Sequence, residues 1–283
     1  MLQLKRLKQR IGAHDEGSPC AQTNIEWWTG SGADGKRLNA IAPCIFPPRR
    51  RICRQRALVE HLIALLVEDM SKPRLLVTGF DSFPGVPVNP TECAMARLAE
   101  RYRDDGHLAF HVVETSYEKS FAGLKPVIER HRPDIVLLTG VDRTARGLRL
   151  ETLARNTIDA SRMDNRDVRP SSTLIDPASA ETLPATVHLE PVRRTLEAHA
   201  IACEMSDNAG GYLCNYLYYR VLAHAASLER PYSAAFVHVP MTVEAHMAAE
   251  TAPQDGHITL PEDALESGLS AIIETLLATR SGQ

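Results

Sequence analysis

The chain has 283 residues, of which 44% are hydrophobic and 24% charged, so it can bury a large core in one or two domains. Residues 1–70 carry 11 Lys and Arg against 7 Asp and Glu, whereas residues 71–283 carry 21 against 28. The acidic main body argues against a nucleic-acid partner, and no apolar run approaches the roughly 20 residues that a membrane helix needs.

The cysteines and histidines indicate neither a disulfide framework nor a metal site. The six cysteines form no Cys-x-x-Cys pair and have no regular spacing; they are Cys20, Cys44, Cys53, Cys93, Cys203 and Cys214. A chain of this length folds without disulfides, so we expect reduced thiols and a cytoplasmic location. His238 and His246 belong to no recognised ligand cluster, and we expect no metal and no organic cofactor.

The first part of the chain differs from the rest. Residues 1–56 mix Gly, Ser, Pro and Arg without helical or strand periodicity, and helical spacing of leucines begins only at residues 57–67. A strand-like run follows soon after Met70. We therefore predict a disordered N-terminal extension over residues 1–69, with Met70 as a candidate true start, and one folded domain over residues 70–283.

Strand-like and helix-like segments alternate through this domain. In chain order they are strand 75–78, a helix opening at 89–92, strand 109–113, helix 117–131, strand 134–140, extended segment 148–153, loop 164–180, helix 189–199, strand 200–205, helix 212–226, strand 234–239 and helix 261–279. The alternation predicts an α/β fold, a three-layer α/β/α sandwich with a mixed, mostly parallel central sheet.

Cys214 lies where such folds bind ligands, in the first turn of a predicted helix just after Gly210-Gly211. Unpaired backbone N–H groups and the positive end of the helix dipole favour a thiolate there, and they can stabilise an oxyanion. Cysteine is also among the most buried residue types, so a structural role is the alternative.

Two further residues complete a possible catalytic set. His238 interrupts an apolar strand near its carboxyl end, where its ring can reach the same rim as general base and acid, although a core histidine is the alternative. Glu151 can orient that imidazole, or it can simply pair with Arg149 on a solvated face. Together the three residues predict a Cys-His-Glu site.

An ordered set of motifs resembles the pyroglutamyl peptidase I family, also called pyrrolidone-carboxylate peptidases. The motifs run from Arg74 to about Val239 and are Leu76–Phe83 with Asn89-Pro90, Pro133–Ile135 leading to Gly140, Glu151 with Asn156, Ile158–Ala160, Asp164-Asn165, Ser206–Tyr216 and Phe236–Pro240. The segment around Cys214 and the segment around His238 are the most specific of these motifs.

The resemblance implies a cysteine exopeptidase that cleaves pyroglutamate from peptides, acts in the cytoplasm and forms a homo-oligomer, a dimer or tetramer. It places the family's catalytic residues on Cys214, His238 and Glu151. It also places the two ring-binding phenylalanines on Phe80 and Phe83, and a lactam-binding backbone group on Val141. Two aromatic faces with backbone partners suit a small neutral ring.

Several positions depart from the family pattern. Pro84 stands where a flexible glycine is common, Val141–Arg146 lacks the usual Gly-Arg, Thr152 replaces an arginine and Ser161–Met163 replaces Arg-x-Pro. These departures keep two alternatives open: a homologue acting on another small amide or a nucleoside, and a non-catalytic protein that binds pyroglutamyl termini.

Overall fold

The computed structural model describes residues 72–252 and 258–280. The predicted extension over residues 1–69, its helix 57–67 and the candidate start Met70 lie outside the described residues.

The centre of the fold is a six-stranded sheet with the strand order β2-β1-β3-β8-β4-β7. Its strands are β1 (Leu75–Phe80), β2 (Leu108–Val113), β3 (Ile135–Val141), β4 (Leu148–Glu151), β7 (Cys203–Ser206) and β8 (Ser233–Val239). Strands β2, β1, β3 and β8 are parallel, while β4 pairs antiparallel with β8 and parallel with β7. The predicted mixed, mostly parallel sheet is confirmed.

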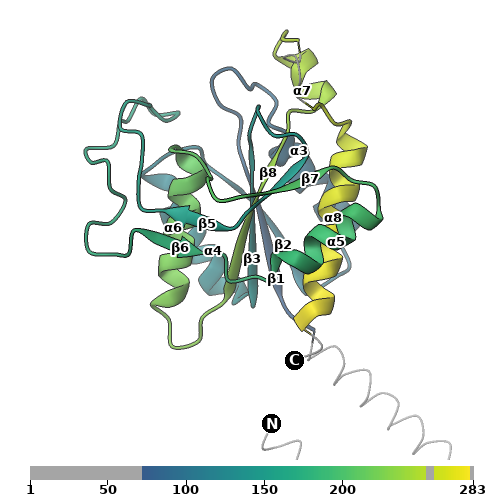
Figure 1. Cartoon of the computed structure of the whole chain (residues 1–283), viewed down its shortest axis with the longest axis horizontal. Coiled ribbons are helices and arrows are strands. Elements are labelled where there is room, and N and C mark those ends of the chain that lie inside the picture. Colours follow the sequence, from purple (N-terminus) through teal and green to yellow (C-terminus); the bar gives the residue numbers. More distant parts are fainter. Residues whose placement is uncertain (1–71, 253–257, 281–283) are drawn as a thin grey trace, which may run out of the picture. The chain divides into compact units, whose positions relative to one another are not determined.

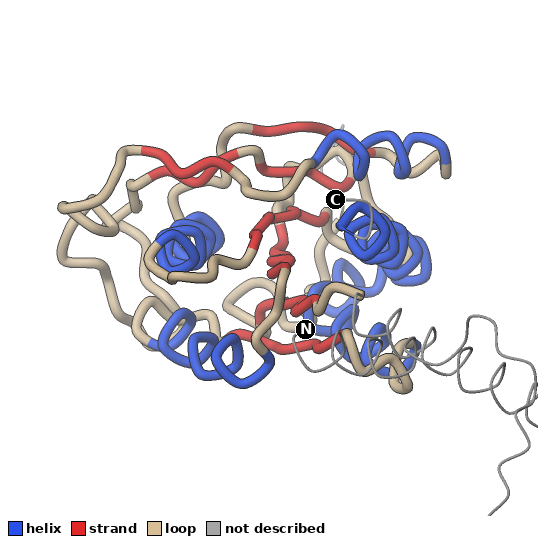
Figure 2. The backbone as a smooth tube through the Cα atoms, turned by 90° about the horizontal axis from the view of Figure 1, so that it is seen from below, coloured by secondary structure: helices blue, strands red, loops and turns tan. Residues whose placement is uncertain are grey.

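Helices cover both faces of this sheet (Figures 1 and 2). They are α3 (Pro90–Arg101), α4 (Lys119–His131), α5 (Leu189–Ala198), α6 (Leu213–Ala226) and α8 (Glu262–Arg280). Successive strand residues point to opposite faces, so Leu76 and Phe80 pack in one core with α4 and α6. Leu75 and Val77 pack in the other core with α3, α5 and α8. The three-layer sandwich is therefore confirmed.

Short elements are where the predicted boundaries were wrong. The extended segment 148–153 is two strands, because Thr152 bonds to Ser206 and the chain then leaves the main sheet. Strand β5 (Leu153–Arg155) pairs instead with β6 (Thr182–Pro184), a strand that was not predicted and that lies just after the predicted loop 164–180. Helix α7 (Val243–Ala248) was also missed, since six residues are too few to show helical periodicity.

The carboxyl ends of three central strands lie together and form the rim of the sheet. Strands β1, β3 and β8 run in the same direction, so their carboxyl ends meet there. Phe80, Val141 and Val239 are the last residues of these strands. Ligands of open α/β sheets bind beyond this edge.

Candidate active site

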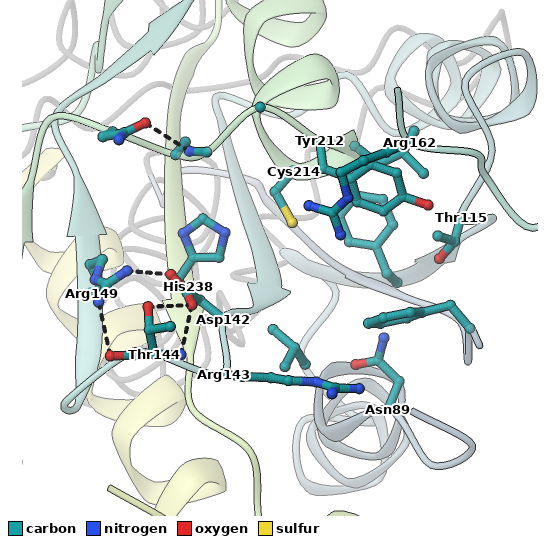
Figure 3. Close-up of a pocket in the computed structure, with 18 residues that line it drawn as sticks. Asn89, Thr115, Asp142, Arg143, Thr144, Arg149, Arg162, Tyr212, Cys214 and His238 are labelled. Atoms are coloured by element: carbon teal, nitrogen blue, oxygen red, sulfur yellow. Dashed lines mark hydrogen bonds and ion pairs between the residues drawn. The ribbon is translucent and has the colours of Figure 1, made fainter. Parts of the chain in front are cut away.

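A cavity of about 390 Å³ opens at this rim (Figure 3). Five of the six predicted site residues line it: Phe80, Phe83, Val141, Cys214 and His238. Glu151 lies beyond His238 and is fully buried. The structure thus brings all six residues to one end of the sheet.

Cys214 is the second residue of α6. Its N-cap, Tyr212, has an extended backbone and makes no side-chain cap, and the first N–H groups of a helix have no partners within it. The thiol lies against Gly140 of β3: a Cβ atom at Gly140 would be 2.8 Å from the Cys214 Sγ and 2.9 Å from the Phe236 ring. Glycine at this position leaves the space that the thiol occupies.

His238 and Glu151 form a buried pair. The His238 Nδ1 lies 2.7 Å from the Glu151 Oε1, and the two residues are 4% and 0% exposed. Strand pairing creates this contact, because β4 runs antiparallel to β8 with Glu151 opposite Phe236 and Arg149 opposite His238. Since Nδ1 faces the carboxylate, Nε2 is the ring nitrogen left for chemistry at the rim.

The surroundings of His238 favour its protonated form. Burial lowers the pKa of the imidazole, but interactions with Cys214 and then with Glu151 outweigh burial and raise the pKa to about 10. The thiols of Cys93 and Cys203 differ, because burial raises their pKa and keeps them protonated. Of the three cysteines in the described residues, Cys214 alone has an imidazole beside it suited to hold a proton.

Phe80 and Phe83 differ in burial and in the backbone hydrogen bonds that fix them. Phe80 is only 4% exposed and its N–H donates to the Thr91 Oγ1 at 2.9 Å, so the end of β1 is fixed to α3. Phe83 is half-buried and begins a tight turn in which the Val86 N–H donates to the Phe83 carbonyl. Pro84 fills the second position of this turn, and Gly85 the third with φ +82°, the arrangement of a type II turn. The proline therefore suits the loop.

Polar residues of the loop between β5 and β6 organise the loop itself. Asp164 accepts hydrogen bonds from the backbone N–H groups of Tyr117, Arg166 and Val168. Burial raises its carboxyl pKa, but these bonds outweigh burial and lower it. The Asn165 side chain donates to the Ser82 carbonyl, which ties this loop to the Phe83 turn.

Four charged cavity residues had no predicted site role: Asp142, Arg143, Arg149 and Arg162. Arg149 pairs with Asp142 and, at 2.7 Å, with the Glu204 Oε1. The alternative pairing of Glu151 with Arg149 on a solvated face is therefore wrong. The sequence did indicate that Asp142 and Arg143 belong to the site, because both follow a buried parallel strand directly, and such residues lie at the ligand-binding rim.

Thr152 does not line the cavity. Its hydroxyl donates to the Ser206 carbonyl at 2.9 Å, and its N–H donates to the same oxygen. Thr152, one of the positions that departs from the pattern implied by the resemblance, therefore joins β4 to β7.

The described residues contain no group of three His, Cys, Asp or Glu side chains placed to hold a metal ion. Within the same ranges, no helix combines the length and apolar character that a bilayer crossing requires.

Comparisons with known proteins agree on one family. The family model described as pyroglutamyl peptidase matches residues 73–278. A pyrrolidone-carboxylate peptidase of Brevibacillus brevis is 31% identical over 207 residues, which cover 72% of this chain and 93% of that protein. One from Gloeobacter violaceus is 32% identical over 171 residues, covering 60% and 83% of the two chains. The solved structure of a mutant pyrrolidone carboxyl peptidase from Pyrococcus furiosus has a TM-score of 0.65 at 26% identity, covering 73% of this chain and 99% of that one.

Proposed function

Because the chain belongs to the pyroglutamyl peptidase family, we propose that it is a cysteine peptidase that removes N-terminal pyroglutamate from peptides. The observation that carries this proposal is the Cys214 thiol at the start of α6, facing an imidazole whose Nδ1 is held by a fully buried carboxylate. This is the arrangement that nucleophilic catalysis by a thiolate requires.

The first half of the proposed reaction forms an acyl-enzyme. The Cys214 thiolate attacks the carbonyl carbon that joins pyroglutamate to the next residue, and the N–H groups at the start of α6 stabilise the resulting oxyanion. The protonated His238 donates its Nε2 proton to the leaving nitrogen. The C–N bond breaks, the shortened peptide leaves as an amine, and pyroglutamate remains as a thioester on Cys214.

The second half consumes water. His238, now neutral, accepts a proton from a water molecule, whose oxygen attacks the thioester carbonyl. The C–S bond breaks, and free pyroglutamate and the Cys214 thiolate beside protonated His238 are restored. Glu151 stabilises the imidazolium and fixes the ring orientation through both halves.

Phe80, Phe83 and Val141 are the residues that we propose bind the pyroglutamyl ring. The ring is small, flat and neutral, with one N–H and one carbonyl group. Aromatic faces at the cavity wall suit its plane, and the backbone at the end of β3 suits its polar groups.

A fluorogenic pyroglutamyl amide tests the proposal. The wild-type chain should release the fluorophore, and Cys214→Ser or alkylation by iodoacetamide should abolish release. Cys93→Ser and Cys203→Ser are matched controls, because neither residue lines the cavity, and both variants should retain activity.

The other outcomes of this assay are equally informative. Full activity of the Cys214→Ser variant would contradict the assignment of Cys214 as the nucleophile. Binding of a pyroglutamyl peptide without turnover would favour the non-catalytic binder. Hydrolysis of nucleosides or other small amides in place of pyroglutamyl amides would favour a divergent activity.

We propose residues 70–283 as the catalytic domain and a homo-oligomer as the working form, both on family resemblance. The family model begins at residue 73, which supports the boundary. A variant that starts at Met70 should retain full activity, and light scattering should give the mass of a dimer or tetramer.

A further inference from the structure

Two guanidinium groups in the cavity, Arg143 and Arg162, have no ion pair among the described residues. Arg143 and Arg162 both line the cavity and are exposed. Neither forms an ion pair with any residue in ranges 72–252 and 258–280, whereas Arg149 in the same wall is paired with Asp142 and Glu204. The cavity lining therefore carries an excess of positive charge, with three arginines against the single carboxylate of Asp142.

Neutral partners hold both groups in place. The Arg143 Nη2 donates to the Gly85 carbonyl, which joins this side chain to the turn that begins at Phe83. The Arg162 Cζ lies 4.1 Å from the centre of the Tyr212 ring, in cation–π contact. In Figure 3 the two side chains lie on different sides of the cavity, Arg162 beside Tyr212 and Arg143 beside Asn89.

The two carboxylates that flank Arg162 in the chain, Asp159 and Asp164, are already engaged. Asp164 accepts the three backbone hydrogen bonds described above. Asp159 accepts hydrogen bonds from the hydroxyl and N–H of Ser161, which are the main causes of its lowered pKa, with a smaller contribution from Arg162. Asp159 does not line the cavity. The guanidinium of Arg162 therefore remains available to a ligand.

The pyroglutamyl ring does not account for these charges, because it is neutral. A cavity of about 390 Å³ is in the range that holds drug-sized ligands, so it has room for the residue after the ring. Guanidinium groups bind carboxylates strongly, and a cleft whose lining has an excess of one sign of charge attracts ligands of the opposite sign.

We propose that the cavity selects pyroglutamyl substrates with a carboxylate next to the scissile bond, and that Arg143 and Arg162 determine this preference. The carboxylate comes either from an acidic side chain on the following residue or from the free terminus of a pyroglutamyl dipeptide. The inference rests on the proposed function and specifies the substrate class of that site.

Two matched ligand pairs separate the sources of charge. The first is pyroglutamyl-glutamate amide against pyroglutamyl-glutamine amide, and the second is pyroglutamyl-alanine against its amide. We expect the wild-type kcat/KM to favour the charged member of at least one pair by roughly fivefold, the effect of about 1 kcal/mol from exposed ion pairs. The preference should decrease as salt is added.

Three variants assign the effect to residues. Arg143→Met and Arg162→Met keep much of the side-chain length without the charge, and each should move the ratio within the preferred pair toward one. Arg146→Met is the matched control, because Arg146 is exposed in the same loop but does not line the cavity, and it should leave the ratio unchanged. The comparison uses the ratio of kcat/KM for the charged and the neutral ligand of one pair. A substitution that lowers activity on both ligands equally therefore leaves the ratio unchanged.

Binding to the Cys214→Ser variant, measured by calorimetry with the same four ligands, keeps the two proposals distinguishable. Charge preference in binding without wild-type turnover would support this inference while the peptidase assignment fails. Equal kcat/KM and Kd within both pairs, or a preference that survives both arginine substitutions, would overturn the inference alone. Failure of all four ligands to bind or react would overturn both.

Discussion

The cavity has two halves built on different principles. Glu151 and His238 come from adjacent strands and are almost completely buried, so sheet hydrogen bonds and core packing fix them. Phe83, Arg143 and Arg162 come from loops, and both arginines are exposed. One half is built on strands and buried from water, and the other is built on loops and exposed.

The departures from the family pattern fall mainly in the second half. Pro84 lies in the Phe83 turn, and Arg143 and Arg162 lie in two other loops that line the cavity. Thr152 follows β4 and does not line the cavity. If the proposed roles hold, changes in the loops alter ligand preference while the strands keep the proposed catalytic groups in place.

The largest expected effect comes from the buried half. Glu151→Gln should lower kcat on a pyroglutamyl amide by about 10³ to 10⁴-fold, because a neutral amide cannot stabilise the imidazolium. Within the described residues the Glu151 Oε2 has no hydrogen-bond partner, so the new amide nitrogen would also be buried without an acceptor. Steady-state kinetics measure the loss, with circular dichroism as the test of folding.

The control for this change is Asp142→Asn, a carboxylate in the exposed half that pairs with Arg149. It should lower kcat by less than about tenfold, since this partly buried ion pair holds neither the imidazole of His238 nor the thiol of Cys214. Equal losses in the two variants would contradict the distinction between the halves.

Gly140→Ala should produce the next largest effect. The new Cβ would lie 2.8 Å from the Cys214 Sγ, so the thiol must move, and a shift of about 1 Å in a reacting group can cost about 10²-fold in rate. Gly123→Ala is the matched control, because a Cβ at that exposed position in α4 meets no atom within 4 Å. It should keep full activity and stabilise the fold by up to about 1 kcal/mol.

Much of this arrangement could be predicted from local patterns. Buried runs in β3 and β8 and the glycines before α6 place His238 and Cys214 at the same rim, because parallel strands end together. Gly140 also carried a signal, since a glycine in a buried strand often marks a close approach. Helix α6 begins within one residue of its predicted start.

The remaining contacts depend on information that the local sequence does not contain. The approach of Glu151 to His238 requires β4 to lie antiparallel beside β8 in one register, and no periodicity specifies that pairing. The cavity arginines depend on loop conformations set by distant partners, such as the Gly85 carbonyl for Arg143. Long-range contacts therefore limit prediction most where the ligand would bind.

The pH dependence tests the electrostatics of the buried half. His238 has a pKa of about 10, and it must be protonated to deliver a proton to the leaving amine. Activity should therefore persist as pH rises through 7 and 8, and kcat/KM should fall about tenfold per pH unit above 10. A fall of kcat/KM that begins near the ordinary histidine pKa of about 6.5 would contradict this account.

In the Cys214→Ala variant, the pKa of His238 measured by NMR should be lower than in the wild type. The interactions with Cys214 are the largest that raise this pKa, and the variant removes them.

The smallest expected effect comes from the exposed half. Phe83→Ala should raise KM for a pyroglutamyl amide about fivefold and change kcat less than twofold, because one aromatic face contributes about 1 kcal/mol to ring binding.

Phe80→Ala is the informative contrast: this side chain is 4% exposed, so its removal should cost about 3 to 5 kcal/mol of folding stability. Urea unfolding and kinetics on both variants separate the two effects. If Phe83→Ala instead destabilised the fold as much as Phe80→Ala with no change in KM, Phe83 would be a core anchor, and the exposed half would lose its part in ring recognition.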